Sequence, residues 1–134
     1  MKRLTIIAAM AALALLAPLA GRAYAQTSEN KAAVEVTTKN FDALTAKGVV
    51  LVDFFATWCG PCRAIAPSVE QLAKEYKGRA VVGKCDVDKD GGLARKFGIN
   101  SIPALLLFKD GILVERQVGA CPKDVLQKML DKHL

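Results

Sequence analysis

The sequence predicts one α/β domain, in which helices cover both faces of a central mixed β-sheet. Three observations predict this fold class. Strand-like and helix-like segments alternate from residue 33 to the C-terminus, and the segment VVLVDFFA (49–56) is an almost continuous apolar run, typical of a central strand covered on both faces. Two later strand-like segments are joined by Asp110-Gly111, which is a strong hairpin signal. A hairpin that follows alternating units makes the sheet parallel at first and antiparallel at its end.

The first elements follow from apolar periodicity and stop signals. We expect a short strand over 33–36, a short helix over 40–46, and the central strand over 49–56. A long helix over 59–76 comes next, and Gly78 stands just past its end, as a helix stop should. One face of this helix is apolar, with Ile65, Val69, Leu72 and Ala73.

The remaining elements complete the order β-α-β-α-β-α-β-β-α. They are predicted as a strand over 80–87, a short helix over 92–97, and hairpin strands over 104–109 and 112–118. The last helix is expected to open with Pro122 as its first helical residue, a position at which proline is favoured. Its apolar face holds Val125, Leu126, Met129 and Leu130.

The N-terminal segment does not belong to this domain. Lys2 and Arg3 are followed by 18 uncharged, mostly apolar residues at 4–21 and by the tripeptide AYA, a pattern that signal peptidase accepts. We therefore expect residues 1–25 to be a secretory signal peptide, cleaved before Gln26. The alternative is an uncleaved anchor, because about 18 apolar residues are just enough to span a bilayer.

Cleavage would leave residues 26–134 as one domain in the periplasm or outside the cell; an uncleaved chain would be anchored to the membrane. The predicted leader contains Lys2, Arg3, Arg22 and no acid, so its removal lowers the formal net charge from +6 to +3. Basic residues of the remaining chain are spread among acids and form no stripe with aromatic residues. A nucleic-acid partner is therefore not expected.

The segment Trp58-Cys59-Gly60-Pro61-Cys62 lies between the central strand and the long helix. Two cysteines three residues apart in a first helical turn can form a small-loop disulfide. The first lies where free backbone N–H groups and the helix dipole favour a thiolate, which is the nucleophilic form. Cys59 is therefore the expected attacking residue, and Cys62 the residue that resolves a mixed disulfide.

A CxxC pair can also be half of a zinc site, which would need a second pair of ligands. Cys85 and Cys121 are single residues far apart, and His133 is the only histidine. Redox chemistry is therefore favoured over metal binding, and neither a metal nor another cofactor is expected.

Asp53 is a lone acid within the apolar strand, six residues before Cys59. A buried carboxylate without a partner is costly, so such a group stays protonated or finds a partner. We interpret Asp53 as a proton acceptor or donor for Cys62; the alternative is an acid at a strand end that reaches water. Lys84 is an equally unusual charge in an apolar strand and is the expected partner of Asp53.

The segments VDFFATWCGPCRAIAP, KCDVD, FGINSIPALLLFKDG and VGA resemble the thioredoxin family in their order and spacing. The resemblance runs from about residue 33 to residue 134 and implies the thioredoxin fold and disulfide exchange with client proteins. It also implies that Ile102-Pro103 forms a cis-proline loop facing the cysteines, and that Asp53 and Lys84 form a buried proton-transfer pair. The substrate-binding residues that it implies are Trp58, Gly60, Pro61, Ile102, Pro103, Gly119 and Ala120.

The chain departs from the family pattern at four positions. Phe55 stands where a tryptophan is common, and Arg63 stands where a lysine is usual. Cys85 and Cys121 are additional cysteines. We expect Cys85 to be an inert core thiol and Cys121 to serve packing; a regulatory or glutathionylated Cys121, or a Cys85–Cys121 disulfide, are the alternatives.

The Gly-Pro dipeptide between the cysteines is similar to that of the reducing members of the family, so the resemblance favours a disulfide reductase. The protein is expected to be a monomer. Its export would require electrons from a membrane thiol donor. The alternatives are an oxidant or isomerase that uses the same cysteines, and a binding module without catalysis. Such a module would dock partners in the shallow apolar groove that the resemblance implies at Trp58, Ile102, Gly119 and Ala120. The client proteins are not identified by the sequence.

Overall fold

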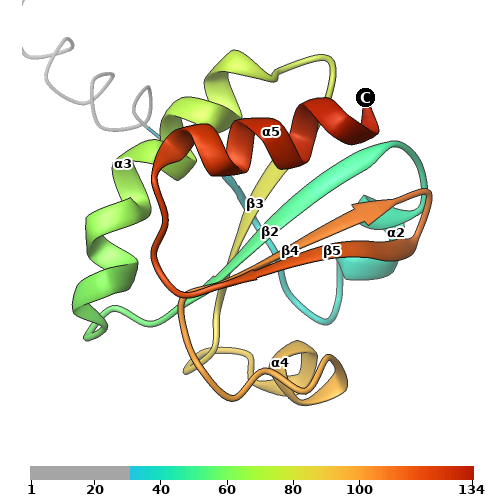
Figure 1. Cartoon of the computed structure of the whole chain (residues 1–134). Helices are drawn as coiled ribbons and strands as arrows, with labels where there is room; N and C mark the ends of the chain where they lie inside the picture. The colour runs from blue at the N-terminus through green and yellow to red at the C-terminus, as the bar shows by residue number, and fades with distance from the viewer. Residues whose placement is uncertain (1–30) are drawn as a thin grey trace, which may run out of the picture.

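The computed structural model describes residues 31–134. Nine elements follow one another in the predicted order (Figure 1). They are β1 (Val34–Glu35), α2 (Phe41–Thr45), β2 (Val49–Phe55), α3 (Gly60–Glu75), β3 (Val81–Asp86), α4 (Gly92–Lys96), β4 (Ala104–Lys109), β5 (Ile112–Val118) and α5 (Lys123–His133). The predicted leader, residues 1–25, lies outside the described residues.

The five strands form one mixed sheet in the order β1-β3-β2-β4-β5. Strands β1 and β2 pair in parallel with β3, whereas β4 is antiparallel to β2 and β5 is antiparallel to β4. The predicted change from parallel to antiparallel pairing is confirmed, and it occurs at β2. This strand lies at the centre of the sheet and leads directly into the CxxC segment.

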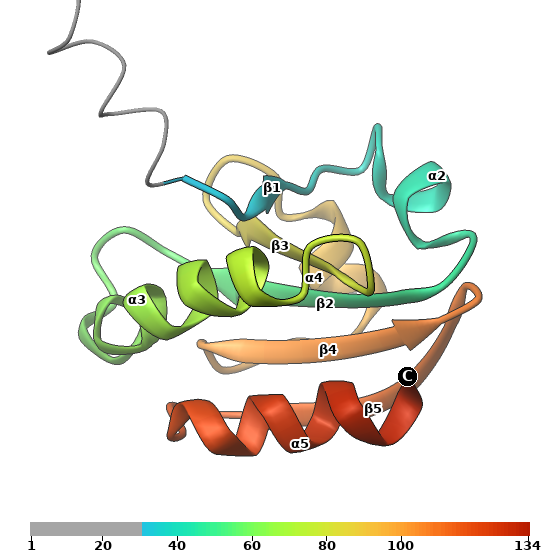
Figure 2. The ribbon, with the colours of Figure 1, turned by 90° about the horizontal axis from the view of Figure 1, so that it is seen from above.

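Helices cover both faces of the sheet (Figures 1 and 2). Helices α3 and α5 lie on one face, and α2 and α4 lie on the other. Strand β2 is buried on both sides because alternate residues enter different cores. Val49 and Leu51 pack with α3 and α5, while Val50, Val52 and Phe54 pack on the side of α2 and α4.

The hairpin between β4 and β5 turns at Asp110-Gly111, as predicted. Both residues have positive φ, 49° and 83°, which matches the tight turns that join antiparallel strands. The Asp110 carboxylate also accepts a hydrogen bond from the Gly48 N–H at 2.8 Å, so the turn is tied to the start of β2.

Three predicted helix starts differ from the structure by one residue, and in each the residue predicted to open the helix is its N-cap. The first is Asn40, the N-cap of α2. Cys59 is the N-cap of α3 rather than its first helical residue. Pro122 is the N-cap of α5, with φ −62° and an extended ψ of 152°, and its carbonyl accepts the Val125 N–H at 3.1 Å. The proline φ suits either position, and only the extended ψ places Pro122 outside the helix.

The described helices are all shorter or more polar than a membrane-crossing helix must be.

Candidate active site around Cys59 and Cys62

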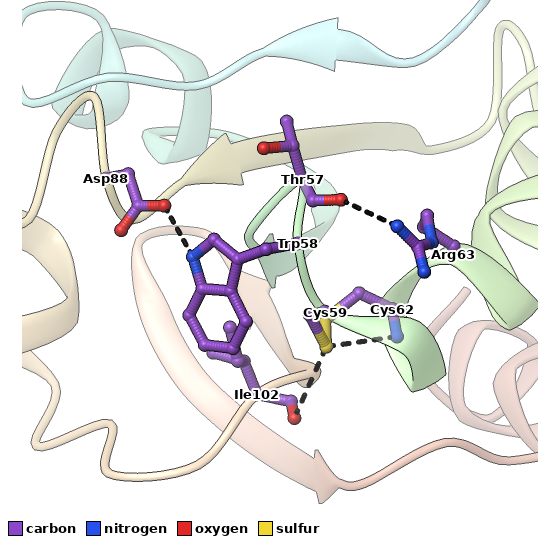
Figure 3. The surroundings of a disulfide bond; sticks show 7 residues. All are labelled: Thr57, Trp58, Cys59, Cys62, Arg63, Asp88 and Ile102. Carbon is purple, nitrogen blue, oxygen red and sulfur yellow. Dashed lines mark hydrogen bonds between the residues drawn. A yellow bond between two sulfur atoms is a disulfide. The ribbon is translucent and has the colours of Figure 1, made fainter.

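The two cysteines lie at the junction of β2 and α3. Cys59 adopts extended backbone angles, φ −78° and ψ 113°, and Cys62 is the third residue of the helix. Their Cα atoms are 5.2 Å apart and their sulfur atoms are bonded to each other (Figure 3). The N-cap geometry therefore brings the two side chains together, and the predicted redox pair is present as a disulfide.

Backbone groups surround the sulfur of Cys59. The Cys62 N–H donates a hydrogen bond to Cys59 Sγ at 3.2 Å, and the Ile102 carbonyl oxygen lies 3.9 Å from the same sulfur (Figure 3). Because the first N–H groups of a helix have no partner within the helix, this contact stabilises a thiolate on Cys59 after reduction. Cys59 is 5% exposed and Cys62 3%, so helix position, rather than exposure, distinguishes their roles.

The segment opposite the cysteines is the loop before β4, where the Ile102–Pro103 peptide bond is cis. The Gly119 N–H donates to the Pro103 carbonyl at 2.8 Å, which joins this loop to the segment after β5. Gly119 has φ 90°, a conformation that favours glycine. The structure thus links the Ile102–Pro103 loop to Gly119, which is 16 residues later in the sequence.

The predicted substrate-binding residues differ in exposure. Pro103 is buried and Ile102 is half-buried, whereas 68% of Trp58 is exposed to solvent. The remaining exposed residues of the set are Gly60, Pro61 and Ala120. An exposed apolar rim around a buried disulfide suits contact with an extended client chain.

Two polar contacts at this site were not predicted. The Trp58 indole Nε1 donates to the Asp88 carboxylate at 2.8 Å, and Arg63 Nη1 donates to the Thr57 carbonyl at 3.4 Å (Figure 3). The first of these hydrogen bonds joins residues 30 positions apart in the sequence and fixes the orientation of the exposed indole ring. No spacing rule connects Trp58 to Asp88, and the only signal was the group of acids in DVDKD.

Asp53 is fully buried on the same face of β2 as Leu51 and Phe55. Neither of its carboxylate oxygens has a hydrogen-bond partner among the described residues. Burial raises the pKa of Asp53 from 3.8 to about 7, and the positive charge of Lys84 opposes this rise only in part. The carboxyl group can therefore take up or release a proton near neutral pH.

Lys84 lies opposite Asp53 in the parallel pairing of β2 and β3, so both side chains leave the same face of the sheet. The two groups interact electrostatically, because the charge of Lys84 lowers the pKa of Asp53, but the Asp53 carboxylate accepts no hydrogen bond from the lysine. Within residues 31–134 the two groups form no ion pair; the Lys84 ammonium instead lies 4.5 Å from the centre of the Phe55 ring. A cation above an aromatic face is attracted by the ring quadrupole and remains partly hydrated, whereas pairing with Asp53 would bury it.

The additional cysteines are free thiols on opposite faces of the sheet, so they cannot form a disulfide with each other. Cys85 is fully buried, and its pKa is raised to about 11, mainly by burial. Cys121 packs at the edge of the core formed by α3 and α5. Burial and the charges of Asp124 and Asp53 raise the pKa of Cys121, so these surroundings disfavour its thiolate.

Cys85 is therefore expected to resist alkylation in the native protein. With a pKa of about 11, about one Cys85 thiol in a thousand is ionised at pH 8, and the side chain is enclosed. Iodoacetamide should modify Cys85 about a hundredfold more slowly than Cys59 of the reduced protein, as measured by peptide mass mapping over time. The control is alkylation in denaturant, where unfolding should remove the protection of Cys85. Equal rates of alkylation for Cys85 and Cys59 in the native protein would contradict the prediction.

Potential metal ligands do not gather in the described part of the chain: no group of three or more His, Cys, Asp or Glu residues is placed to hold an ion. Cys59 and Cys62 are joined to each other, and His133 instead contacts Glu115 at 3.0 Å.

Comparison with known proteins agrees with this geometry. The family model described as Thioredoxin matches residues 32–132. The chain is 53% identical to thioredoxin from Staphylococcus haemolyticus (strain JCSC1435) and 52% identical to that from Staphylococcus aureus (strain N315). Each alignment covers 77% of this chain and 99% of the relative. Among solved structures, a mutant thioredoxin from Halobacterium salinarum NRC-1 has a TM-score of 0.70 and 39% identity, over 75% of this chain and 88% of that one.

The fold, the CxxC pair at a helix N-terminus and these similarities lead to one conclusion about the chemistry. A disulfide that is held beside a cis-proline loop and exposed residues such as Trp58 can exchange with disulfides of client proteins. The chain belongs to the thioredoxin family and is a dithiol–disulfide oxidoreductase.

Proposed function

We propose that this protein reduces disulfide bonds of client proteins outside the cytoplasm. The observation that carries the direction of electron flow is the buried Asp53 carboxyl on the α3 side of β2. It lies on the same face as Phe55, whose side chain packs against Cys59 and Cys62. A negative charge there disfavours thiolate formation by the dithiol.

A redox pair is oxidising when its reduced form is strongly stabilised, above all as a thiolate. Here the contacts of the Cys59 sulfur among the described residues are one backbone N–H and one carbonyl oxygen. The guanidinium of Arg63, next to the motif, bonds the Thr57 carbonyl instead. With little charge stabilisation of the dithiol form, the pair should donate electrons rather than withdraw them.

The exchange proceeds in two balanced steps. The Cys59 thiolate attacks one sulfur of the client disulfide, forming a Cys59–client bond and releasing the other client sulfur as a thiolate. The Cys62 thiol then gives its proton to the Asp53 carboxylate, and the Cys62 sulfur attacks Cys59. The Cys59–Cys62 bond forms, the client leaves as a second thiolate, and two electrons have passed to the client. A carboxyl with a pKa of about 7 is matched to this proton transfer at neutral pH.

The location is proposed from the N-terminal sequence. A positive start, an apolar run and an AYA tripeptide precede the family match, which begins at residue 32.

A reductase in an oxidising compartment needs a continuing electron supply, for which we propose a membrane thiol donor. The surface beside Cys59 must be open to both donor and client, which suits a monomer. Sedimentation of the purified protein tests this state.

Equilibration with glutathione tests the direction of electron flow. The purified protein is incubated over a range of reduced-to-oxidised glutathione ratios, quenched in acid and analysed by mass for the Cys59–Cys62 disulfide. The expected result is that the pair stays oxidised until glutathione is almost fully reduced. A pair more oxidising than glutathione would overturn the reductase proposal and favour an oxidant or isomerase.

A Cys62→Ala variant is expected to trap clients. The first attack by Cys59 remains possible, but the resolving thiol is absent, so the mixed disulfide accumulates. Trapped partners are separated on non-reducing gels and identified by mass spectrometry. The matched control is the Cys59→Ser/Cys62→Ala double variant, which should trap nothing; equal trapping by both variants would show that another thiol makes the bond.

A further inference from the structure

The positions of Asp53 and Lys84 on neighbouring strands raise a physical question. The two residues are opposite each other on adjacent parallel strands, with their side chains on one face, yet the carboxylate has no hydrogen-bond partner among the described residues. An ammonium group that reached it would relieve this orphaned carboxyl. The cost of burying the ammonium favours its place near the surface, and the contacts of the lysine there show what else stabilises that place.

The Lys84 ammonium lies over the ring of Phe55. Phe55 is opposite Asp86 in the same pairing, so its ring lies diagonally across from Lys84, and the ammonium is 4.5 Å from the ring centre. Both residues line a surface pocket of about 290 Å³, whose other charged walls are the acids Glu35 and Asp86 and the lysines Lys31 and Lys89. The pocket gives the ammonium an open surrounding of mixed charge, while Asp53 stays enclosed.

The remaining elements around Asp53 supply no other cation. The buried residues of α3 are apolar apart from Cys62, those of α5 are all apolar, and Leu105 faces Asp53 from β4. Cys121, on the segment before α5, is close enough for the charge of Asp53 to affect its pKa. Lys84 is thus the cation of the described residues whose position decides the electrostatics of Asp53.

We propose that Phe55 is a positioning residue for the exchange reaction: its ring holds the Lys84 ammonium over the pocket and keeps it from pairing with Asp53. Asp53 thereby remains a carboxyl that both accepts and donates a proton near neutral pH. If the lysine paired with it, the carboxylate would be held as a stable anion and would become a weaker base. This inference rests on the proposed role of Asp53 as the proton partner of Cys62.

The test follows the titration of the Asp53 carboxyl by NMR in the oxidised protein and the pH profile of client reduction. Phe55→Leu keeps an apolar side chain but removes the ring. The Asp53 titration midpoint is expected to move to lower pH by about one pH unit, because an approaching opposite charge favours the carboxylate. The pH profile should move in the same direction. Phe55→Tyr retains the aromatic face and should leave both unchanged.

A double-mutant cycle separates the lysine from packing. Lys84→Met removes the cation, and adding Phe55→Leu to it should cause no further shift of the midpoint. An equal shift in both backgrounds, or no shift in either, would overturn the role of Phe55. If Phe55→Leu does not fold, Phe55→Met takes its place in the cycle.

The pH profile of client reduction and the Asp53 titration midpoint distinguish failure of the positioning role of Phe55 from failure of the proposed role of Asp53. If Asp53→Asn leaves the pH profile of client reduction unchanged, Asp53 is not the proton partner of Cys62, whatever Phe55 does to its titration. If Asp53→Asn changes the profile but Phe55→Leu leaves the Asp53 midpoint in place, only the positioning role is lost.

Discussion

Replacement of Cys59 by serine is expected to abolish disulfide exchange, with a loss of about three orders of magnitude or more in the rate of client reduction. Cys59 is the N-cap of α3, and its sulfur receives the Cys62 N–H, so it is the sulfur whose thiolate the helix stabilises. A serine hydroxyl in the same place remains protonated and is a poor nucleophile towards sulfur. The reduction of a disulfide-bonded test protein by a small-thiol donor measures the effect.

Cys121→Ser is the matched control for this variant. Cys121 is a free thiol, packs at the edge of the core and has a raised pKa, so the control should keep nearly all activity. Substantial reduction by Cys59→Ser, or a large loss in Cys121→Ser, would show that the attacking sulfur had been assigned to the wrong residue.

Asp53→Asn is expected to stabilise the oxidised protein above neutral pH. The pKa of Asp53 is raised from 3.8 to about 7 on folding, so between these values the folded state holds a proton that the unfolded state has released. The free energy of unfolding therefore falls as pH rises through this window, by about 4 kcal/mol in total. Asparagine does not ionise, so the variant avoids this loss. Its advantage should be small near pH 4 and approach about 4 kcal/mol at pH 8.

Denaturant unfolding of both proteins at several pH values between 4 and 8 measures this difference. Asp42→Asn, which changes an exposed carboxylate in α2, is the control and should show no comparable dependence on pH. A constant difference between Asp53→Asn and the unchanged protein across the range would mean that Asp53 is ionised in the folded state throughout, with a partner that lowers its pKa.

The local features of the fold follow from short stretches of sequence. The apolar run of β2 predicts a central strand because a strand buried on both faces has no polar side to present. Asp110-Gly111 predicts the hairpin because its residues accept positive φ. The last helix begins one residue later than predicted, because proline fixes φ and leaves ψ free to be extended at Pro122.

In the active site, too, some features follow from short stretches of sequence and others do not. The role of Cys59 can be read from its place before a helix, and that of Asp53 from a single acid in an apolar strand, because burial and helix termini are local properties that sequence pattern encodes. The contact of Trp58 with Asp88 and the seating of Lys84 on Phe55 join residues 30 and 29 positions apart. No periodicity relates such pairs.

By itself, the sequence determined that this is an α/β protein with a CxxC pair at a helix start and one buried acid near it. These properties depend on the order of apolar and polar residues along one or two elements. Only the tertiary structure decided how the charged groups of Asp53 and Lys84 are placed relative to each other and to their surroundings. Two strands place Asp53 and Lys84 opposite each other, yet the lysine lies over an aromatic ring and the carboxylate has no partner among the described residues. That choice depends on the relative cost of burying an ammonium group and of leaving it at the surface, which is set by the packing of several segments at once.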